Sequence, residues 1–208
     1  MSDSATRHKL AHHYLALSAD APLSKISVSM ITQASGMSRK TFYRYFRDRE
    51  QLTLWIFQTT LARTLSDRAP GCLMRRNRNG LPFYLASSTD PLRTHYLFLD
   101  ALSACLVEHK AFFAQSLRET QPGSLAHHIV EIYTPAVSGL IVCALAPDGA
   151  SAESIRLTAD LYLRALLAFY REHLGAMTHG NLTMFQNILY GLADSCLCNK
   201  RLRCCRIS

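Results

Sequence analysis

A turn built around a glycine separates two short helical segments near the N-terminus. Ser27 can cap the first segment, residues 28–34, and Ser38 can cap the second, residues 39–46. Gly36 lies between them, and glycine adopts the left-handed backbone of a tight turn at no steric cost. Two short helices joined in this way are typical of a helix-turn-helix, whose second helix lies on the surface. The pattern therefore predicts a small helical unit with one exposed helix.

A cluster of positive charge begins in the second helical segment and continues just beyond it. The protein has 208 residues and a formal net charge of +8. A compact basic cluster beside a near-neutral remainder is typical of a module that binds a polyanion, but a solvated helix face rich in arginine gives the same count. Charge alone leaves both interpretations open. The clustered basic residues are Arg39, Lys40, Arg44, Arg47 and Arg49.

The residues around this turn resemble the DNA-binding signature of TetR-type transcriptional regulators. The resemblance rests on Gly36, on the Thr-Phe-Tyr triplet at 41–43, and on the spacing from Phe46 to Leu52. It covers about 30 residues, 25–54, and the rest of the chain is similar only in length and in its helical pattern.

The resemblance implies a fold and a set of DNA contacts. Residues 1–50 would form a three-helix helix-turn-helix domain, and residues 51–208 would form a helical ligand-binding and dimerisation domain. Hydroxyl groups and one arginine would contact phosphates, and the remaining basic residues would enter the groove. An alternative remains for the two tyrosines, which a small bundle could hold half-buried in its core. The implied DNA-binding residues are Ser27, Ser38, Arg39, Lys40, Thr41, Tyr43, Arg44, Tyr45 and Arg49.

Helical periodicity continues from Pro91 almost to the end of the chain, and no alternating apolar pattern longer than a few residues appears. The fold class is therefore expected to be all-α. Residues 69–90 contain proline, glycine and a run of arginine and asparagine, so we expect a connection there, while residues 199–208 form a short basic tail. The expected helices after the connection cover residues 91–107, 109–118, 124–145, 152–176 and 181–198.

Apolar residues recur at heptad-like spacing in the last two expected helices. Two adjacent helices with such stripes suit a four-helix dimer interface to which each subunit contributes two helices, and the family resemblance points the same way. Packing of both stripes inside one subunit would produce the same pattern, so that alternative stays open. The predicted interface residues are Tyr162, Leu166, Phe169, Leu182, Phe185, Leu189, Leu192 and Cys196.

Aromatic and histidine residues are frequent in the region where TetR-type proteins usually hold an effector. Ordinary core packing explains most such residues, and it stands as the alternative to a pocket. The candidate pocket residues are His95, Phe98, His109, Phe113, Tyr133 and Tyr162.

The sequence contains no P-loop, GxSxG, HExxH or dinucleotide-binding motif, so we expect neither an enzyme nor a bound cofactor. His127 and His128 are adjacent and would point about 100° apart on a helix, so no metal site is expected from them. A frayed tail is the simplest interpretation of the C-terminal cysteines, with a redox or soft-metal site as the alternative. These cysteines are Cys196, Cys198, Cys204 and Cys205.

No run reaches 18 apolar residues, and the first twenty residues lack the apolar core of a secretory signal. We therefore expect a cytoplasmic protein with no membrane-spanning helix. The function expected from the resemblance is that of a ligand-responsive repressor, a homodimer that binds a double-stranded DNA operator and an unidentified small-molecule effector. The alternative is a protein-interaction adaptor or co-activator that keeps the fold but not operator binding.

Overall fold

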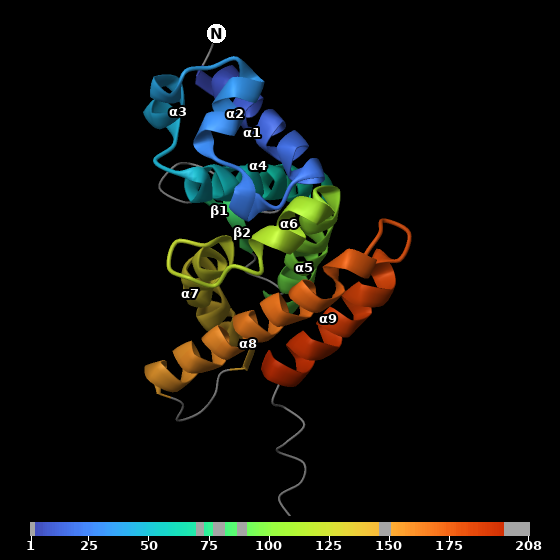
Figure 1. Ribbon diagram of the computed structural model, residues 1–208. Helices are drawn as coiled ribbons and strands as arrows, with labels where there is room; N and C mark the ends of the chain where they lie inside the picture. The colour runs from blue at the N-terminus through green and yellow to red at the C-terminus, as the bar shows by residue number, and fades with distance from the viewer. Residues whose placement is uncertain (1–2, 70–72, 77–81, 87–90, 146–150, 198–208) are drawn as a thin grey trace, which may run out of the picture.

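The computed structural model describes residues 3–69, 73–76, 82–86, 91–145 and 151–197. The protein is all-α in class, as predicted, with an N-terminal helix-turn-helix unit above a helical body (Figure 1). The elements in chain order are α1 (Asp3–Asp20), η1 (Leu23–Lys25), α2 (Val28–Ser35), α3 (Arg39–Tyr45), α4 (Arg49–Arg68), β1 (Leu73–Arg76), β2 (Pro82–Ala86), α5 (Pro91–Glu108), α6 (Lys110–Ser116), α7 (Leu125–Leu145), α8 (Ala152–His173), η2 (Leu174–Ala176) and α9 (Leu182–Leu197).

The helix-turn-helix forms as the sequence predicts, from its caps inward. The Ser27 side chain accepts a hydrogen bond from the Met30 N–H, and the Ser38 side chain accepts one from the Thr41 N–H, so each helix gains a partner for an otherwise unpaired donor. Gly36 ends α2 in the left-handed region, at φ 63°. The turn therefore packs α2 against α3 and leaves the outer side of α3 in solvent.

The core of this unit is aromatic and aliphatic. Ile31 of α2 and Phe42 of α3 are fully buried, and Phe46 closes the far side with its ring centroid 5.8 Å from that of Phe42. Leu10 and Tyr14 of α1 are also buried in this core. Full burial of such side chains stabilises the unit by roughly 1.5–3 kcal/mol each.

Helix α4 connects the N-terminal unit to the body (Figure 1). Its buried residues occur on more than one side, as a helix packed between two units requires, and the Phe57 ring meets the Phe113 ring of α6 edge-on at 6.1 Å. Further along, α4 contacts α5, α7 and β2. Any displacement of the body therefore acts directly on α4.

The segment after α4 differs from the expected plain connection. Residues Leu73–Arg76 and Pro82–Ala86 pair as a short antiparallel hairpin, with Leu73 opposite Ala86 and Met74 opposite Leu85. Strands of four and five residues are too short to give a clear alternating pattern in a sequence that also contains proline and glycine. β2 contacts α4, α5 and α7, so the hairpin forms part of the junction between α4 and the body.

The body consists of α5 to α9, with α8 and α9 side by side at its lower edge (Figure 1). The segment Leu125–Val142 of α7 is long enough and apolar enough to cross a membrane, judged by length and composition alone. No such helix is expected from the sequence, because this segment is not an uninterrupted apolar run. In the structure α7 packs against α8, α5 and α4, and its buried face belongs to the protein core.

A histidine lies fully buried in the body. His95 Nε2 is 2.7 Å from the hydroxyl oxygen of Tyr162, and burial lowers the pKa of His95 to about 3. The unfolded chain binds a proton at this residue below its ordinary pKa of about 6.5, whereas the folded protein does not bind it until pH 3. The contribution of His95 to the free energy of unfolding is therefore fully present above pH 6.5, and it decreases as the pH falls toward 3.

We expect the His95 contribution to lower the free energy of unfolding by about 2 kcal/mol between pH 7 and pH 5. Denaturant unfolding at the two pH values measures the change, and the His95→Gln variant supplies the control because glutamine keeps a polar group opposite Tyr162 without titrating. The variant should lose about 2 kcal/mol of the pH dependence. An identical pH dependence in both proteins would contradict the assignment.

Candidate nucleic-acid interface

Helix α3 presents a basic, polar surface to solvent. The side chains of Arg39, Lys40 and Arg44 are exposed, and Tyr43 is 50% exposed. The Arg39 guanidinium lies 5.9 Å from the centroid of the Tyr43 ring, which restricts both side chains. Because Phe42 is fully buried on the opposite side, α3 cannot rotate these groups inward without opening the core. The predicted base-reading residues thus lie together on one exposed helix.

The predicted phosphate-binding hydroxyls flank the two helix starts. Ser38 and Thr41 are 2.9 Å apart through their hydroxyl oxygens, and both lie at the N-terminus of α3. Ser27 holds the same position on α2. A serine hydroxyl that accepts one backbone N–H can still donate its own hydrogen to a phosphate oxygen, so capping and phosphate contact are compatible.

A groove of about 370 Å³ separates the start of α2 from α3. Its walls combine three cationic side chains with hydroxyl groups, and the N-terminus of α2 opens toward it, where the helix dipole favours an anion. This chemistry suits a phosphate of the DNA backbone. The lining residues are Ser24, Lys25, Ile26, Ser27, Val28, Ser29, Arg39, Tyr43 and Arg49.

Arg49 and Tyr45, like several other predicted DNA contacts, have partners within the protein. Arg49 Nη1 donates to the carbonyl oxygens of Leu23 and Ile26, each at 2.5 Å. The Tyr45 hydroxyl donates to the Asp3 carboxylate at 2.7 Å and is half-buried. This half-buried position and internal bond agree with the alternative for Tyr45, a packed aromatic, and its predicted phosphate contact stays a prediction. Arg49 holds the segment before α2, and a phosphate contact would add to that role.

The six candidate pocket residues separate into two groups. His95, Phe98, Tyr133 and Tyr162 are buried together between α5, α7 and α8, with the Phe98 and Tyr133 ring centroids 5.0 Å apart. His109 and Phe113 lie elsewhere, at the start of α6, where Phe113 packs on α4. The single predicted pocket is therefore replaced by one buried cluster in the body and a second cluster at the junction.

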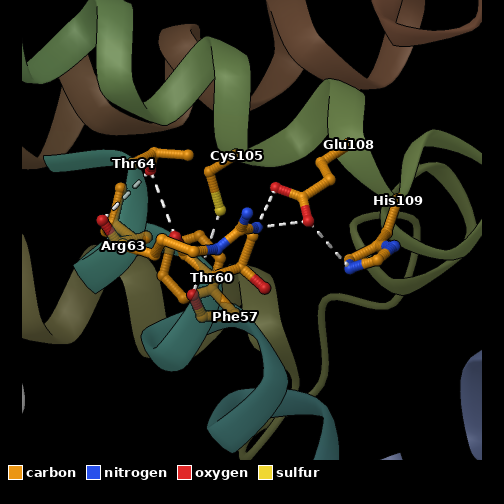
Figure 2. A network of polar contacts seen from close by, with 8 residues as sticks. Phe57, Thr60, Arg63, Thr64, Cys105, Glu108 and His109 are labelled. Carbon is orange, nitrogen blue, oxygen red and sulfur yellow. Dashed lines mark hydrogen bonds and ion pairs between the residues drawn. The ribbon is translucent and has the colours of Figure 1, made fainter. Parts of the chain in front are cut away.

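The second cluster contains an ion pair that sequence reasoning did not find (Figure 2). Arg63 of α4 donates to both oxygens of Glu108 at the end of α5, and His109 Nε2 lies 3.6 Å from the same carboxylate. Cys105 is fully buried beside it, with its sulfur 3.9 Å from the Phe57 carbonyl oxygen. Burial raises the pKa of the Cys105 thiol, so this cysteine is a neutral core group. Forty-five residues separate Arg63 from Glu108, and no local pattern pairs them.

The predicted dimer stripe lies inside the subunit, which corrects the sequence-based assignment. Phe169 and Leu192 are half-buried against the same core, and the Phe169 and Phe185 rings meet across α8 and α9 at 6.2 Å. The side chain of Cys196 lies outside the described residues. The buried members of the stripe are therefore packed as in the alternative, in which the stripes face their own subunit. The buried members of the stripe are Tyr162, Leu166, Leu182, Phe185 and Leu189.

The opposite faces of the same two helices carry exposed apolar side chains. Each of these side chains is at least half exposed to solvent, and each helix contributes two, spaced four residues apart. They therefore form one stripe on each helix. These residues are Leu157 and Leu161 of α8, with Met184 and Ile188 of α9.

Comparison with known proteins gives a consistent result for the N-terminal part. The family model described as "Bacterial regulatory proteins, tetR family" matches residues 15–54. A curated relative from Lactococcus lactis subsp. lactis (strain IL1403), the HTH-type dhaKLM operon transcriptional activator DhaS, is 42% identical over 45 residues. That match covers 22% of this chain and 24% of the relative, so sequence similarity spans about a quarter of the relative's length.

Solved structures resemble the whole chain in fold. The dihydroxyacetone kinase operon activator DhaS has a TM-score of 0.52 at 17% identity, covering 95% of this chain and 97% of its own. A TetR transcriptional regulator from Rhodococcus sp. RHA1 has a TM-score of 0.58 at 13% identity, covering 95% and 99%. RolR in complex with its ligand resorcinol has a TM-score of 0.51 at 18% identity, covering 91% and 87%.

Proposed function

We propose that this chain, which belongs to the tetR family of bacterial regulatory proteins, is a ligand-responsive repressor that binds its operator as a homodimer. Its membership makes it a DNA-binding transcriptional regulator. The observation that carries the proposal is the exposed face of α3, where Arg39, Lys40 and Arg44 project beside a groove lined with cationic and hydroxyl groups. In such a protein α3 would lie in the major groove, and the Ser27 and Ser38 hydroxyls would contact phosphates on either side.

The proposed dimer uses the exposed stripe on α8 and α9. A second copy of the chain is the occupant that suits this surface, because a two-fold axis would place each apolar stripe against its own equivalent. Leu157 and Leu161 lie beside the intrahelical ion pair of Asp160 with Arg164, which would supply a polar rim. A dimer of this kind would also present two α3 helices to one DNA duplex.

The proposed effector site is the buried cluster of His95, Phe98, Tyr133 and Tyr162. Aromatic rings with a hydroxyl and an imidazole nitrogen suit a small, largely apolar ligand that carries one or two polar groups. RolR, a structural relative, has been solved with resorcinol. A ligand there would press on α5 and α7, both of which contact α4, and could favour a state with a different separation of the two α3 helices.

Selection of DNA from a randomised double-stranded library tests the proposal. We expect an enriched, two-fold symmetric sequence whose half-site centres lie one helical turn apart, about 34–36 Å. A reporter gene placed behind that sequence should fall in expression when the protein is present. Failure to enrich any sequence would favour the adaptor alternative, and increased reporter expression would contradict the repressor part, in line with the activator description of DhaS.

A further inference from the structure

The end of α5 and the short helix α6 that follows it bond to α4 and to η1. Just before the start of α6, Glu108 pairs with Arg63 of α4 (Figure 2). Near its end, Gln115 Oε1 accepts a hydrogen bond of 2.9 Å from the Leu23 N–H of η1. A helix of seven residues spans only about 10 Å, so little slack separates the two attachments. The stretch from Glu108 to Gln115 therefore ties the body to α4 at one end and to η1 at the other.

The bond from Gln115 supplies a cap that the local sequence lacks. The first N–H groups of a helix have no partner within it, and Pro22, which precedes η1, makes no side-chain capping bond. The body therefore satisfies the Leu23 N–H from 92 residues away. Leu23 is buried, so loss of this acceptor would leave its backbone donor without a protein partner.

The opposite side of η1 is held by α4. Arg49 Nη1 donates to the carbonyl oxygens of Leu23 and Ile26, so η1 is fixed between Gln115 of the body and Arg49 of α4. Ile26 directly precedes Ser27, the cap of α2. The position of η1 therefore determines where α2 begins and how the DNA-binding helices are oriented against the body.

The surrounding joint contains a small cavity. One ring pair, Tyr14 of α1 with Phe112 of α6, crosses it at 5.2 Å. Beside Leu23 lies a cavity of about 20 Å³, room for about one water, with Glu50 of α4 and Glu119 of the body among its lining residues. The bond from the Leu23 N–H to Gln115 is thus a directional contact across the joint, beside this cavity.

We propose that Gln115 is a positioning residue for DNA binding, which sets the angle of the helix-turn-helix unit on the body through the Leu23 N–H. The proposal rests on the proposed function. In a homodimer, this angle would fix the separation of the two α3 helices and hence the operator spacing that the protein accepts. Loss of the bond should lower the free energy needed to turn each helix-turn-helix unit on the body. Operators with altered spacing should then be bound with affinities closer to that for the natural spacing.

The test measures binding to the selected operator and to versions with one base pair inserted or removed at its centre, a shift of about 3.4 Å along the duplex. The variant is Gln115→Met, which keeps an unbranched side chain of similar length and removes the acceptor. We expect the ratio of dissociation constants for altered and natural spacing to fall by about threefold to tenfold, the size that follows from losing one ordinary hydrogen bond. Gln115→Glu keeps an acceptor and should keep the wild-type ratio.

The matched control is Lys110→Met, on the same helix. Lys110 Nζ donates to the Gly175 and Met177 carbonyl oxygens, within the body, so this variant should weaken α6 without changing the spacing ratio. An unchanged ratio in Gln115→Met, or an equal fall in Lys110→Met, would overturn the proposal. If wild-type protein binds no DNA sequence selectively, the proposed function fails instead.

A second measurement covers the case in which Gln115→Met does not fold. Hydrogen exchange of the wild-type protein should show a protected Leu23 amide, because its hydrogen is bonded and buried. Exchange of the Leu23 amide at the rate of a free peptide would overturn the proposal without any variant.

Discussion

Replacement of Leu161 by glutamate should convert the protein to a monomer and abolish operator binding. Leu161 is 67% exposed in the single subunit and is the most exposed member of the apolar stripes on α8 and α9. In the proposed dimer this position is buried against the partner, so each subunit would bury an unpaired carboxylate. At roughly 3 kcal/mol for each of the two carboxylates, the dissociation constant of the dimer should rise about ten-thousandfold.

Light scattering across a concentration series measures this change. Val142→Glu is the matched control, because Val142 is also an exposed apolar residue but lies on α7, outside the stripe. It should remain dimeric and bind DNA normally. A stable Leu161→Glu dimer would show that the subunits associate through another surface. Leu189→Glu is unsuitable for this test, since Leu189 is fully buried in the subunit and the variant should fail to fold.

Replacement of Arg39 by alanine should weaken operator binding by about 1–3 kcal/mol for each half-site and relax the base preference at one position of each half-site. Arg39 is exposed near the start of α3, where a recognition helix contacts base edges. Its guanidinium can donate two parallel hydrogen bonds to a guanine, which alanine cannot replace. Binding assays against operators with every base substituted in turn measure both effects.

Two further variants serve as comparisons for Arg39→Ala. Lys25→Ala, in the groove beside the start of α2, should weaken binding to all sequences about equally and reduce the salt dependence, as expected for loss of a phosphate contact. Tyr45→Phe should change DNA affinity little, because the Tyr45 hydroxyl already donates to Asp3. If Arg39→Ala lowers affinity for all sequences to the same extent, Arg39 contacts a phosphate and another residue of α3 reads the bases.

Local features of the helix-turn-helix could be predicted from the sequence to the residue. The caps at Ser27 and Ser38 and the left-handed Gly36 depend on interactions within a few residues, and the structure confirms all three. Burial of Ile31 and Phe42 follows from the same short-range pattern. In each of these features, the interacting residues lie within a few positions of one another in the sequence.

Features that depend on distant partners were beyond the sequence. The heptad spacing through Leu189 correctly indicates an apolar stripe, but spacing does not say whether a stripe faces its own subunit or a partner. The exposed stripe through Leu161 and Ile188 is shorter and mixed with polar residues, so it gave no comparable signal. The contacts of Arg63 with Glu108 and of Gln115 with Leu23 join residues 45 and 92 positions apart, and no periodicity connects them.

The central claim is that a dimer of this chain recognises a specific DNA sequence through α3. The most direct measurement compares the dissociation constants for the selected operator and for a scrambled duplex of equal length, at two salt concentrations, with the stoichiometry determined in the same titration. The account predicts two subunits on one operator and a preference of at least about a thousandfold at physiological salt. Equal affinity for both duplexes, lost in parallel as salt rises, would contradict it, because it would mean that the basic face of α3 binds DNA only through its charge.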